Sequence, residues 1–198
     1  MNAFPDTFSI IDTETTGMHP SYARVIDIGI IRVEKGEVVE RYETLVNPGE
    51  PVPRPITRLT GITDQMLVGA PVFADVALEV EKLLSGAVFV AHNASFDYGF
   101  IKHEFARAGI EWSAESLCTV TLSRQLFPGE RSHSLEAIIE RYGIGTDERH
   151  RALPDAEAVL EFMQSVSREV EPRVLERALR IKESGTRPKY PTEERFIT

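Results

Sequence analysis

Cysteine is almost absent from this 198-residue chain, which contains only Cys118. A single cysteine excludes a disulfide within the chain and a cluster of cysteine metal ligands, and it favours a reducing compartment. No apolar run approaches the roughly 18 residues that a membrane span needs, and the N-terminal residues lack the basic and apolar regions of a signal peptide. We therefore expect a cytoplasmic localisation and no membrane partner.

Basic charge is also scarce, because 22 Lys and Arg stand against 31 Asp and Glu, for a net charge of -9. This balance argues against a broad basic surface that grips long duplex DNA, but it allows an enzyme that holds a few nucleotides. The segment 168–198 differs, because it has eight basic and six acidic residues. We predict a main domain over residues 1–168 and, over residues 169–198, an appended C-terminal helix with a mobile tail.

Hydrophobic periodicity divides the chain into opening strands and later helices, with no internal repeat. β-branched residues with partial alternation predict three strands beginning near Phe8, Arg24 and Glu37, and Gly36 predicts a hairpin between the last two. A further strand is predicted over 87–93, and helices over 73–84, 98–108, 135–142, 156–166 and 173–183. This order indicates an α/β fold in which helices pack on a mixed sheet.

Three residues mark where the predicted helices begin and end. Ser134 is placed to cap the start of the helix over 135–142, and Gly143 is placed to end it. Pro154 falls in the first turn of the next helix, where a missing N–H group costs nothing.

The stretch FSIIDTETTG, Phe8 to Gly17, puts two carboxylates at the end of the first strand. Asp12 and Glu14 point to the same side, because side chains in a strand alternate with a period of two. Two carboxylates repel by about 4 kcal/mol at ~4 Å with an effective dielectric constant near 20, and a divalent cation with oxygen ligands removes that repulsion. The stretch therefore predicts a metal site.

Two alternatives explain this stretch without such a site, or with a different one. Asp12 can be an ordinary surface acid and Glu14 a capping residue in a tight turn. A haloacid-dehalogenase-type phosphatase has two Asp at this spacing, but here the second acid is Glu14. The later lysine and acidic pair of such a phosphatase are also missing in any recognisable context.

Two further segments carry acids near the starts of predicted helices. In AHNASFD a strand leads to Asp97, which taken alone is better explained as a helix cap or a partner of the helix dipole than as a catalytic residue. In HRALPD, His150 lies in a loop and Asp155, five residues later, lies in the first turn of a helix. A lone loop histidine is normally a solvated polar residue. The three segments together are more specific than any one of them.

Taken together, DTETTG, HNASFD and HRALPD resemble the DEDDh, or DnaQ-like, family of 3′-to-5′ exonucleases. This family includes the proofreading exonuclease of bacterial DNA polymerase III and ribonuclease T. LTGIT, from Leu59, and HSLEAIIERYGI, from His133, also look like the family, and the resemblance spans roughly Phe8 to Val166. It implies a ribonuclease-H-like fold, with a mixed five-stranded sheet flanked by helices, and makes residues 1–168 the exonuclease domain.

The resemblance also implies the catalytic residues and their roles. Two Mg²⁺ or Mn²⁺ ions are expected, with Asp12 as the bridging ligand. Glu14 and Asp155 complete the site of the ion that holds the attacking water, and Asp97 helps to hold the second ion, directly or through water. His150 is the expected general base, because imidazole titrates near neutral pH.

Five residues are expected by resemblance to bind the substrate. Thr15 and Met18 flank the terminal nucleotide, and Asn93 hydrogen-bonds the backbone of the strand. Ile62 and Phe96 stack on the last bases or wedge between them, which would suit any sequence because every base has a π-face. Ordinary core packing is the alternative for Met18, Ile62 and Phe96.

The function that the resemblance implies is metal-dependent 3′-to-5′ hydrolysis of single-stranded DNA ends to nucleoside 5′-monophosphates, in proofreading or repair. An exonuclease that trims RNA 3′ ends, like ribonuclease T, is the main alternative, since nothing in the motifs reads a 2′-OH. A catalytically silent polymerase adaptor is a remote one. The acidic composition predicts a weak grip on the strand, so a DNA polymerase or repair partner is expected to dock on residues 169–198. The basic residues of this segment either add contacts to the nucleic-acid strand or form a solvated helix face.

Overall fold

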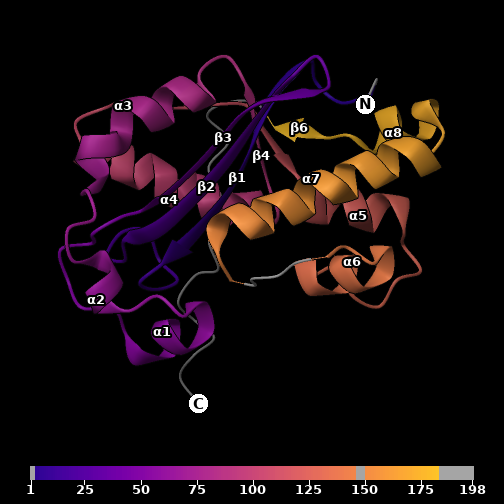
Figure 1. Cartoon of the computed structure of the whole chain (residues 1–198). Coiled ribbons are helices and arrows are strands. Elements are labelled where there is room, and N and C mark those ends of the chain that lie inside the picture. Colours follow the sequence, from indigo (N-terminus) through magenta and orange to yellow (C-terminus); the bar gives the residue numbers. More distant parts are fainter. Residues whose placement is uncertain (1–2, 146–149, 183–198) are drawn as a thin grey trace.

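The computed structural model describes residues 3–145 and 150–182, which form a sheet with helices on both faces (Figure 1). The strand order is β3-β2-β1-β4-β5-β6. The strands are β1 (Thr7–Thr15), β2 (Val25–Glu34), β3 (Glu37–Leu45), β4 (Val88–Ala91), β5 (Ser116–Cys118) and the two-residue β6 (Ile181–Lys182). The mixed five-stranded sheet is confirmed, and β6 extends it at one edge.

The three opening strands form an antiparallel meander, in which the hairpin predicted between the last two is confirmed. β1 pairs with β2 and β2 with β3, both antiparallel, while β4 pairs with β1 in parallel. Lys35 and Gly36 connect β2 to β3 with φ angles of 51° and 85°. Positive φ at both central residues is typical of a type I′ hairpin turn, which matches the twist of the strands.

Helices cover the two faces of the sheet with separate hydrophobic cores. On one face lie α3 (Phe73–Leu84) and α4 (Ala94–Arg107), and on the other lie α6 (Leu135–Tyr142) and α7 (Ala152–Glu169). Within β1, Phe8 and Ile10 belong to the α7 core, and Ile11 belongs to the α3–α4 core. The alternation therefore directs Asp12 and Glu14 toward the α7 face.

The predicted helix signals are found where they were expected. Ser134 accepts a hydrogen bond from the Ala137 N–H group at 3.3 Å, and Gly143 ends α6 with a φ of 63°. Pro154 lies in the first turn of α7.

Several short elements have no counterpart in the sequence prediction. They are β5, β6, α1 (Arg54–Thr60), α2 (Asp64–Leu67) and α5 (Thr119–Leu126). The last helix, α8 (Pro172–Ala178), is shorter than the predicted 173–183, because Ile181 and Lys182 pair with β5 instead. Leu175 and Ala178 of α8 pack in the α7 core.

The predicted tail lies largely outside the described residues, so the division at residue 168 stays a prediction. Within the described residues, no helix is long and apolar enough to cross a membrane.

Candidate active site

The carboxylate pair lies where β1 extends beyond its parallel neighbour. The pairing of β1 with β4 ends at Ile10 and Val90, whereas the pairing with β2 continues through Asp12 opposite Gly29 and Glu14 opposite Asp27. The end of β1 is therefore open on the β4 side, where the first turn of α4 approaches it.

Asp97 reaches this open end from α4. The Thr13 N–H group donates to Asp97 Oδ1 at 3.0 Å, and the Thr13 hydroxyl donates to the same oxygen at 2.8 Å. The side chain is only 3% exposed. The charge of Asp97 acts on Asp12, whose pKa it helps to raise.

Asp155 approaches from the opposite face of the sheet, and a glycine determines how close it comes. A Cβ atom on Gly29 would lie 2.3 Å from the Leu153 nitrogen and 2.4 Å from the Ala152 carbonyl carbon. Real Cβ atoms do not come so close to backbone, so the first turn of α7 can rest on β2 only where the strand has no side chain. Asp155 belongs to that turn and is 5% exposed.

A buried acid on β2 holds Arg151, the residue that precedes α7. Asp27, which is 0% exposed, accepts from Arg151 Nε at 2.8 Å and from the Ala152 N–H group at 3.3 Å. Arg151 also pairs with Glu43 on β3 at 2.9 Å. His150, just before this arginine, adopts a φ of 58°, a left-handed conformation that few non-glycine residues take.

The turn at His150 brings the histidine to the carboxylates. One ligand atom each from Glu14, His150 and Asp155 lie within 4.8 Å of one another. Asp12 and Asp155 also line one common groove. Oxygen donors with one imidazole nitrogen suit a divalent cation. Four of the five predicted catalytic residues thus meet at the end of β1, and Asp97 adjoins them through Thr13.

The electrostatics of the site also fit a bound cation. Burial, followed by the charges of Asp97, Asp155 and Glu14, raises the pKa of Asp12 well above its ordinary value. Burial and then Asp155 raise the pKa of Glu14 to about 8, against a small opposing effect of Arg151. Burial raises the pKa of Asp97 to about 7, although its hydrogen bonds with Thr13 act in the opposite direction. The folded chain therefore holds protons on these acids where a cation would displace them.

Metal binding should consequently depend steeply on pH. A ligand carboxylate must lose its proton first, and the pKa values of Asp97 and Glu14, about 7 and about 8, lie in the neutral range. We expect the affinity for Mn²⁺ to rise about tenfold per pH unit from pH 6 to 8, with release of about one proton per ion. Calorimetry in two buffers of different ionisation enthalpy measures that release, and an affinity independent of pH would contradict it.

The predicted substrate residues have different environments. Met18 is 71% exposed, Asn93 is exposed at the start of α4, and Phe96 is half-buried with its ring 4.8 Å from that of Phe100. Thr15 is nearly buried, and its hydroxyl donates to the Gly17 carbonyl at 2.7 Å. Ile62 is 0% exposed, so core packing, the alternative considered from the sequence, describes it here.

Ile62 has a structural role in this fold. It packs in a small cluster with Ile26, Val52 and Leu67, beneath α1 and α2. A side chain with no exposed surface cannot stack on a base, so we leave Ile62 out of the function proposed below.

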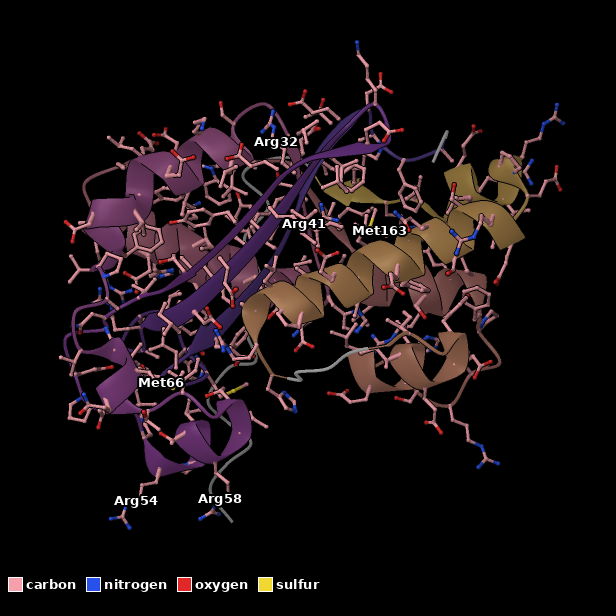
Figure 2. The ribbon with its side chains drawn as sticks, in the orientation of Figure 1. Arg32, Arg41, Arg54, Arg58, Met66 and Met163 are labelled. Atoms are coloured by element: carbon pink, nitrogen blue, oxygen red, sulfur yellow. The ribbon has the colours of Figure 1, made fainter. Side chains whose placement is uncertain are left out.

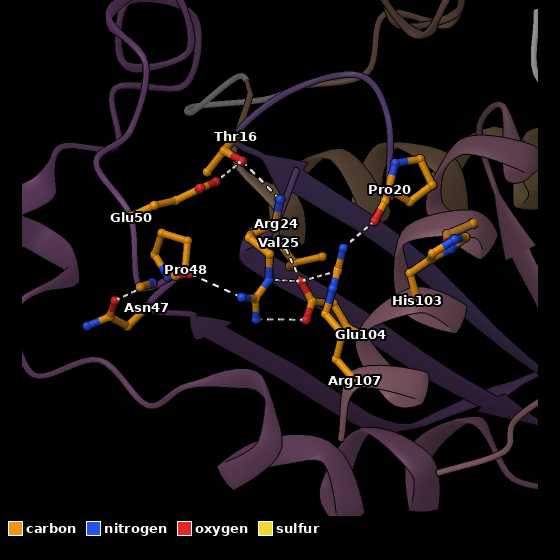
Figure 3. Close-up of polar contacts among 12 residues, drawn as sticks. Thr16, Pro20, Arg24, Val25, Asn47, Pro48, Glu50, His103, Glu104 and Arg107 are labelled. Carbon is orange, nitrogen blue, oxygen red and sulfur yellow. Dashed lines mark hydrogen bonds and ion pairs between the residues drawn. The ribbon is translucent and has the colours of Figure 1, made fainter. Parts of the chain in front are cut away.

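A buried acid ties the loop that carries Met18 to α4 (Figure 3). Both oxygens of Glu104, which is 1% exposed, accept from Arg24, at 2.8 and 3.0 Å. Arg107, one turn further along α4, pairs with Glu104 at 3.2 Å and donates to the Pro20 carbonyl. The loop between β1 and β2 is thereby fastened at both Pro20 and Arg24.

Three residues that build the site were not found by sequence reasoning: Gly29, Asp27 and Arg151. The available signal was Gly29, because a glycine inside a strand often marks a close approach by another backbone. Asp27 and Arg151 are 124 positions apart, and no local pattern joins them.

Carboxylates from both faces of the sheet gather at the end of β1 beside His150, and together they form a candidate site for a divalent cation. The chain belongs to the exonuclease family, because the family model described as Exonuclease, that of RNase T, matches residues 9–163. Exonucleases of this type use divalent metal ions.

Individual relatives agree with this assignment. The chain is 43% identical over 152 residues to the 3′-5′ exonuclease DinG of Bacillus subtilis, covering 76% of this chain and 16% of that protein. It is 38% identical over 170 residues to the DNA polymerase III subunit epsilon of Aquifex aeolicus, covering 85% of this chain and 84% of that protein. The chain thus spans a small part of DinG and nearly the whole of the epsilon subunit.

A solved structure confirms the fold. E. coli Exonuclease I in complex with a dA16 oligonucleotide superposes with a TM-score of 0.77 at 21% identity, covering 87% of this chain and 43% of that one.

Proposed function

We propose that this chain is a metal-dependent 3′-to-5′ exonuclease that removes nucleoside 5′-monophosphates from single-stranded DNA ends, in proofreading or repair. The observation that carries the proposal is the meeting of Asp12, Glu14, His150 and Asp155 at the end of β1, with Asp97 held beside them by Thr13. Relatives named as a 3′-5′ exonuclease and as a polymerase III subunit support the polarity and the substrate.

Two Mg²⁺ or Mn²⁺ ions are the proposed cofactors, held by Asp12, Glu14, Asp97 and Asp155. When bound, such ions stabilise the negative charge on the attacking and leaving oxygens of phosphodiester hydrolysis. Four carboxylates balance the charge of two divalent ions, in keeping with the raised pKa values of Asp12, Glu14 and Asp97.

His150 is proposed as the general base that takes the proton of the attacking water at its imidazole nitrogen. The ion pair of Asp27 with Arg151, the next residue, holds the backbone beside His150 to β2. Thr15, Met18 and Phe96 are proposed to contact the terminal nucleotide, and Asn93 the backbone of the strand. Of these, Met18 and Asn93 have the exposure that contact requires.

A DNA polymerase or repair complex is the proposed partner, and the similarity to a polymerase III subunit supports it. We propose residues 169–198 as the segment that docks on it. The single cysteine, Cys118, is free in the structure, which suits the reducing cytoplasm proposed as its compartment.

A paired digestion tests the function. End-labelled single-stranded DNA and RNA of one sequence are each incubated with the chain in Mn²⁺ and in EDTA, with Asp155→Asn as the matched inactive variant. We expect metal-dependent shortening from the 3′ end, faster on DNA, and none with the variant. Faster digestion of RNA would instead make the chain an RNA-trimming enzyme, and no digestion of either would favour a silent adaptor.

A further inference from the structure

A groove of about 800 Å³ leads away from the carboxylates toward α5 and α6. Asp12 and Asp155 line it at one end, and Arg124 and Arg131 line it as well, with Asn93 between β4 and α4. In Figure 1, α5 and α6 lie on one side of the strand ends, and α1 and α2 lie on the other. We call this cavity the upstream groove.

A neutral histidine fixes one wall of the upstream groove. His92 lies at the end of β4, with Nε2 3.0 Å from the His133 carbonyl and Nδ1 2.9 Å from the Thr119 hydroxyl. Burial lowers the pKa of His92 to about 4, so the ring is uncharged, and Nε2–H donates to the carbonyl while Nδ1 accepts. The loop that carries Arg131 is therefore anchored to the strand that leads into the site.

The arginines of the groove are exposed, and their local environment is cationic. Arg124 lies in the last turn of α5 and Arg131 in the loop before α6. Glu130, the acid next to Arg131, is already paired with Arg141 at 3.1 Å. Burial, followed by the charges of Arg141 and Arg124, holds the pKa of His133 below its ordinary value.

One further acid, Glu136, also lines the groove, and it already has an interaction of its own. The cations therefore stand opposite a single additional carboxylate in a chain whose net charge is -9. On so acidic a protein, two exposed arginines in a groove that opens at the catalytic carboxylates are placed for an anionic polymer.

We propose that the upstream groove binds the substrate strand on the 5′ side of the scissile bond, with Arg124 and Arg131 each contacting a backbone phosphate. The inference rests on the proposed function, because an exonuclease must place the terminal nucleotide on one side of its metal site and the rest of the strand on the other. The contacts are to phosphates, so they carry no sequence preference.

Substrates of different length test this assignment. The p-nitrophenyl ester of thymidine 5′-monophosphate and a dinucleotide each contain only the phosphate that is hydrolysed. An octanucleotide has six further phosphates on the 5′ side of its scissile bond. In the variant Arg124→Gln/Arg131→Gln we expect the kcat/KM of the two short substrates to be unchanged and that of the octanucleotide to fall about tenfold. The salt dependence of octanucleotide binding should weaken by about 0.7 in logarithmic slope per arginine removed.

A charge-matched control is available on α1. Arg54 and Arg58 are exposed and project from α1 into solvent (Figure 2), so Arg54→Gln/Arg58→Gln removes the same charge outside the groove. The proposal would be overturned if the kcat/KM on the octanucleotide fell equally in this control, or if it did not fall in the groove variant.

Binding can be measured separately from hydrolysis. Fluorescence anisotropy of a labelled octanucleotide with Ca²⁺ should show weaker binding for the groove variant, whether or not the chain is catalytically active. A wild type that binds the strand through the groove but hydrolyses none of the substrates would contradict the proposed function alone.

Discussion

Asp12→Asn should abolish hydrolysis and, in the absence of metal, raise the thermal stability of the protein. The amide keeps the shape of the side chain but removes a charge that burial and the charges of Asp97, Asp155 and Glu14 destabilise. We expect activity to fall about a thousandfold or more, because the proposed bridging ligand is lost. A gain of about 1 kcal/mol in the free energy of unfolding raises the melting temperature by about 2–4 °C for a domain of this size.

The sign of the pH dependence follows from the raised pKa values. The folded chain binds protons that the unfolded chain has released, so these acids favour folding below their unfolded pKa values and lose that effect as pH rises through 7 and 8. Melting in EDTA should therefore show the wild type losing stability between pH 5.5 and 8, with Asp12→Asn losing less.

The matched control is Glu161→Gln, which removes an exposed acid from α7. It should change neither the activity nor the difference in melting temperature between the two pH values. If Asp12→Asn melted below the wild type at pH 8 in EDTA, the acid cluster would be stabilising, contrary to the prediction. Added Mn²⁺ should stabilise the wild type more than Asp12→Asn, because bound metal favours the folded state.

Gly29→Ala should both destabilise the protein and inactivate it, although the residue is neither polar nor exposed to substrate. The new Cβ atom would fall 2.3 Å from the Leu153 nitrogen, so the start of α7 has to move away from β2. Overpacking of this kind costs about 1–3 kcal/mol. A displacement of about 1 Å in Asp155 and the preceding loop would lower the rate on the order of a hundredfold.

Gly129→Ala is the matched control, because a Cβ atom there has nothing within 4 Å. It should leave both the melting temperature and the rate on the p-nitrophenyl ester unchanged. Mn²⁺ affinity measured well below the melting temperature separates a displaced site from simple unfolding. Wild-type metal affinity and rate in folded Gly29→Ala would show that α7 does not depend on this contact.

The parts of the site that could be predicted from sequence are those with a local cause. A period of two placed Asp12 and Glu14 on one side of β1, and capping signals bounded α6 between Ser134 and Gly143. Pro154 marked the first turn of α7. Resemblance to the exonucleases then predicted which acids would gather, and membership of that family is confirmed.

The parts that sequence reasoning missed depend on contacts between distant segments. The carboxylate of Asp27 anchors Arg151, 124 positions later, and only the folded sheet brings them together. β5 has three residues and α5 has eight, too few for a clear hydrophobic period. α8 ends early because Ile181 finds a strand partner in Leu117, which no helical pattern could reveal.

The buried Glu104 connects the loop between β1 and β2 to the helix that carries Asp97. Asp97 and Glu104 lie seven residues apart on α4, about 10 Å along a single rigid helix. Arg24, bound to Glu104, ends the loop that carries Met18, so this ion pair joins the loop to the helix directly. If the terminal nucleotide contacts this loop as proposed, a displacement of the loop by a badly fitting nucleotide would pass through Glu104 to α4 and to Asp97. The position of Asp97, and with it the rate of hydrolysis, would then depend on how well the last base fits the loop.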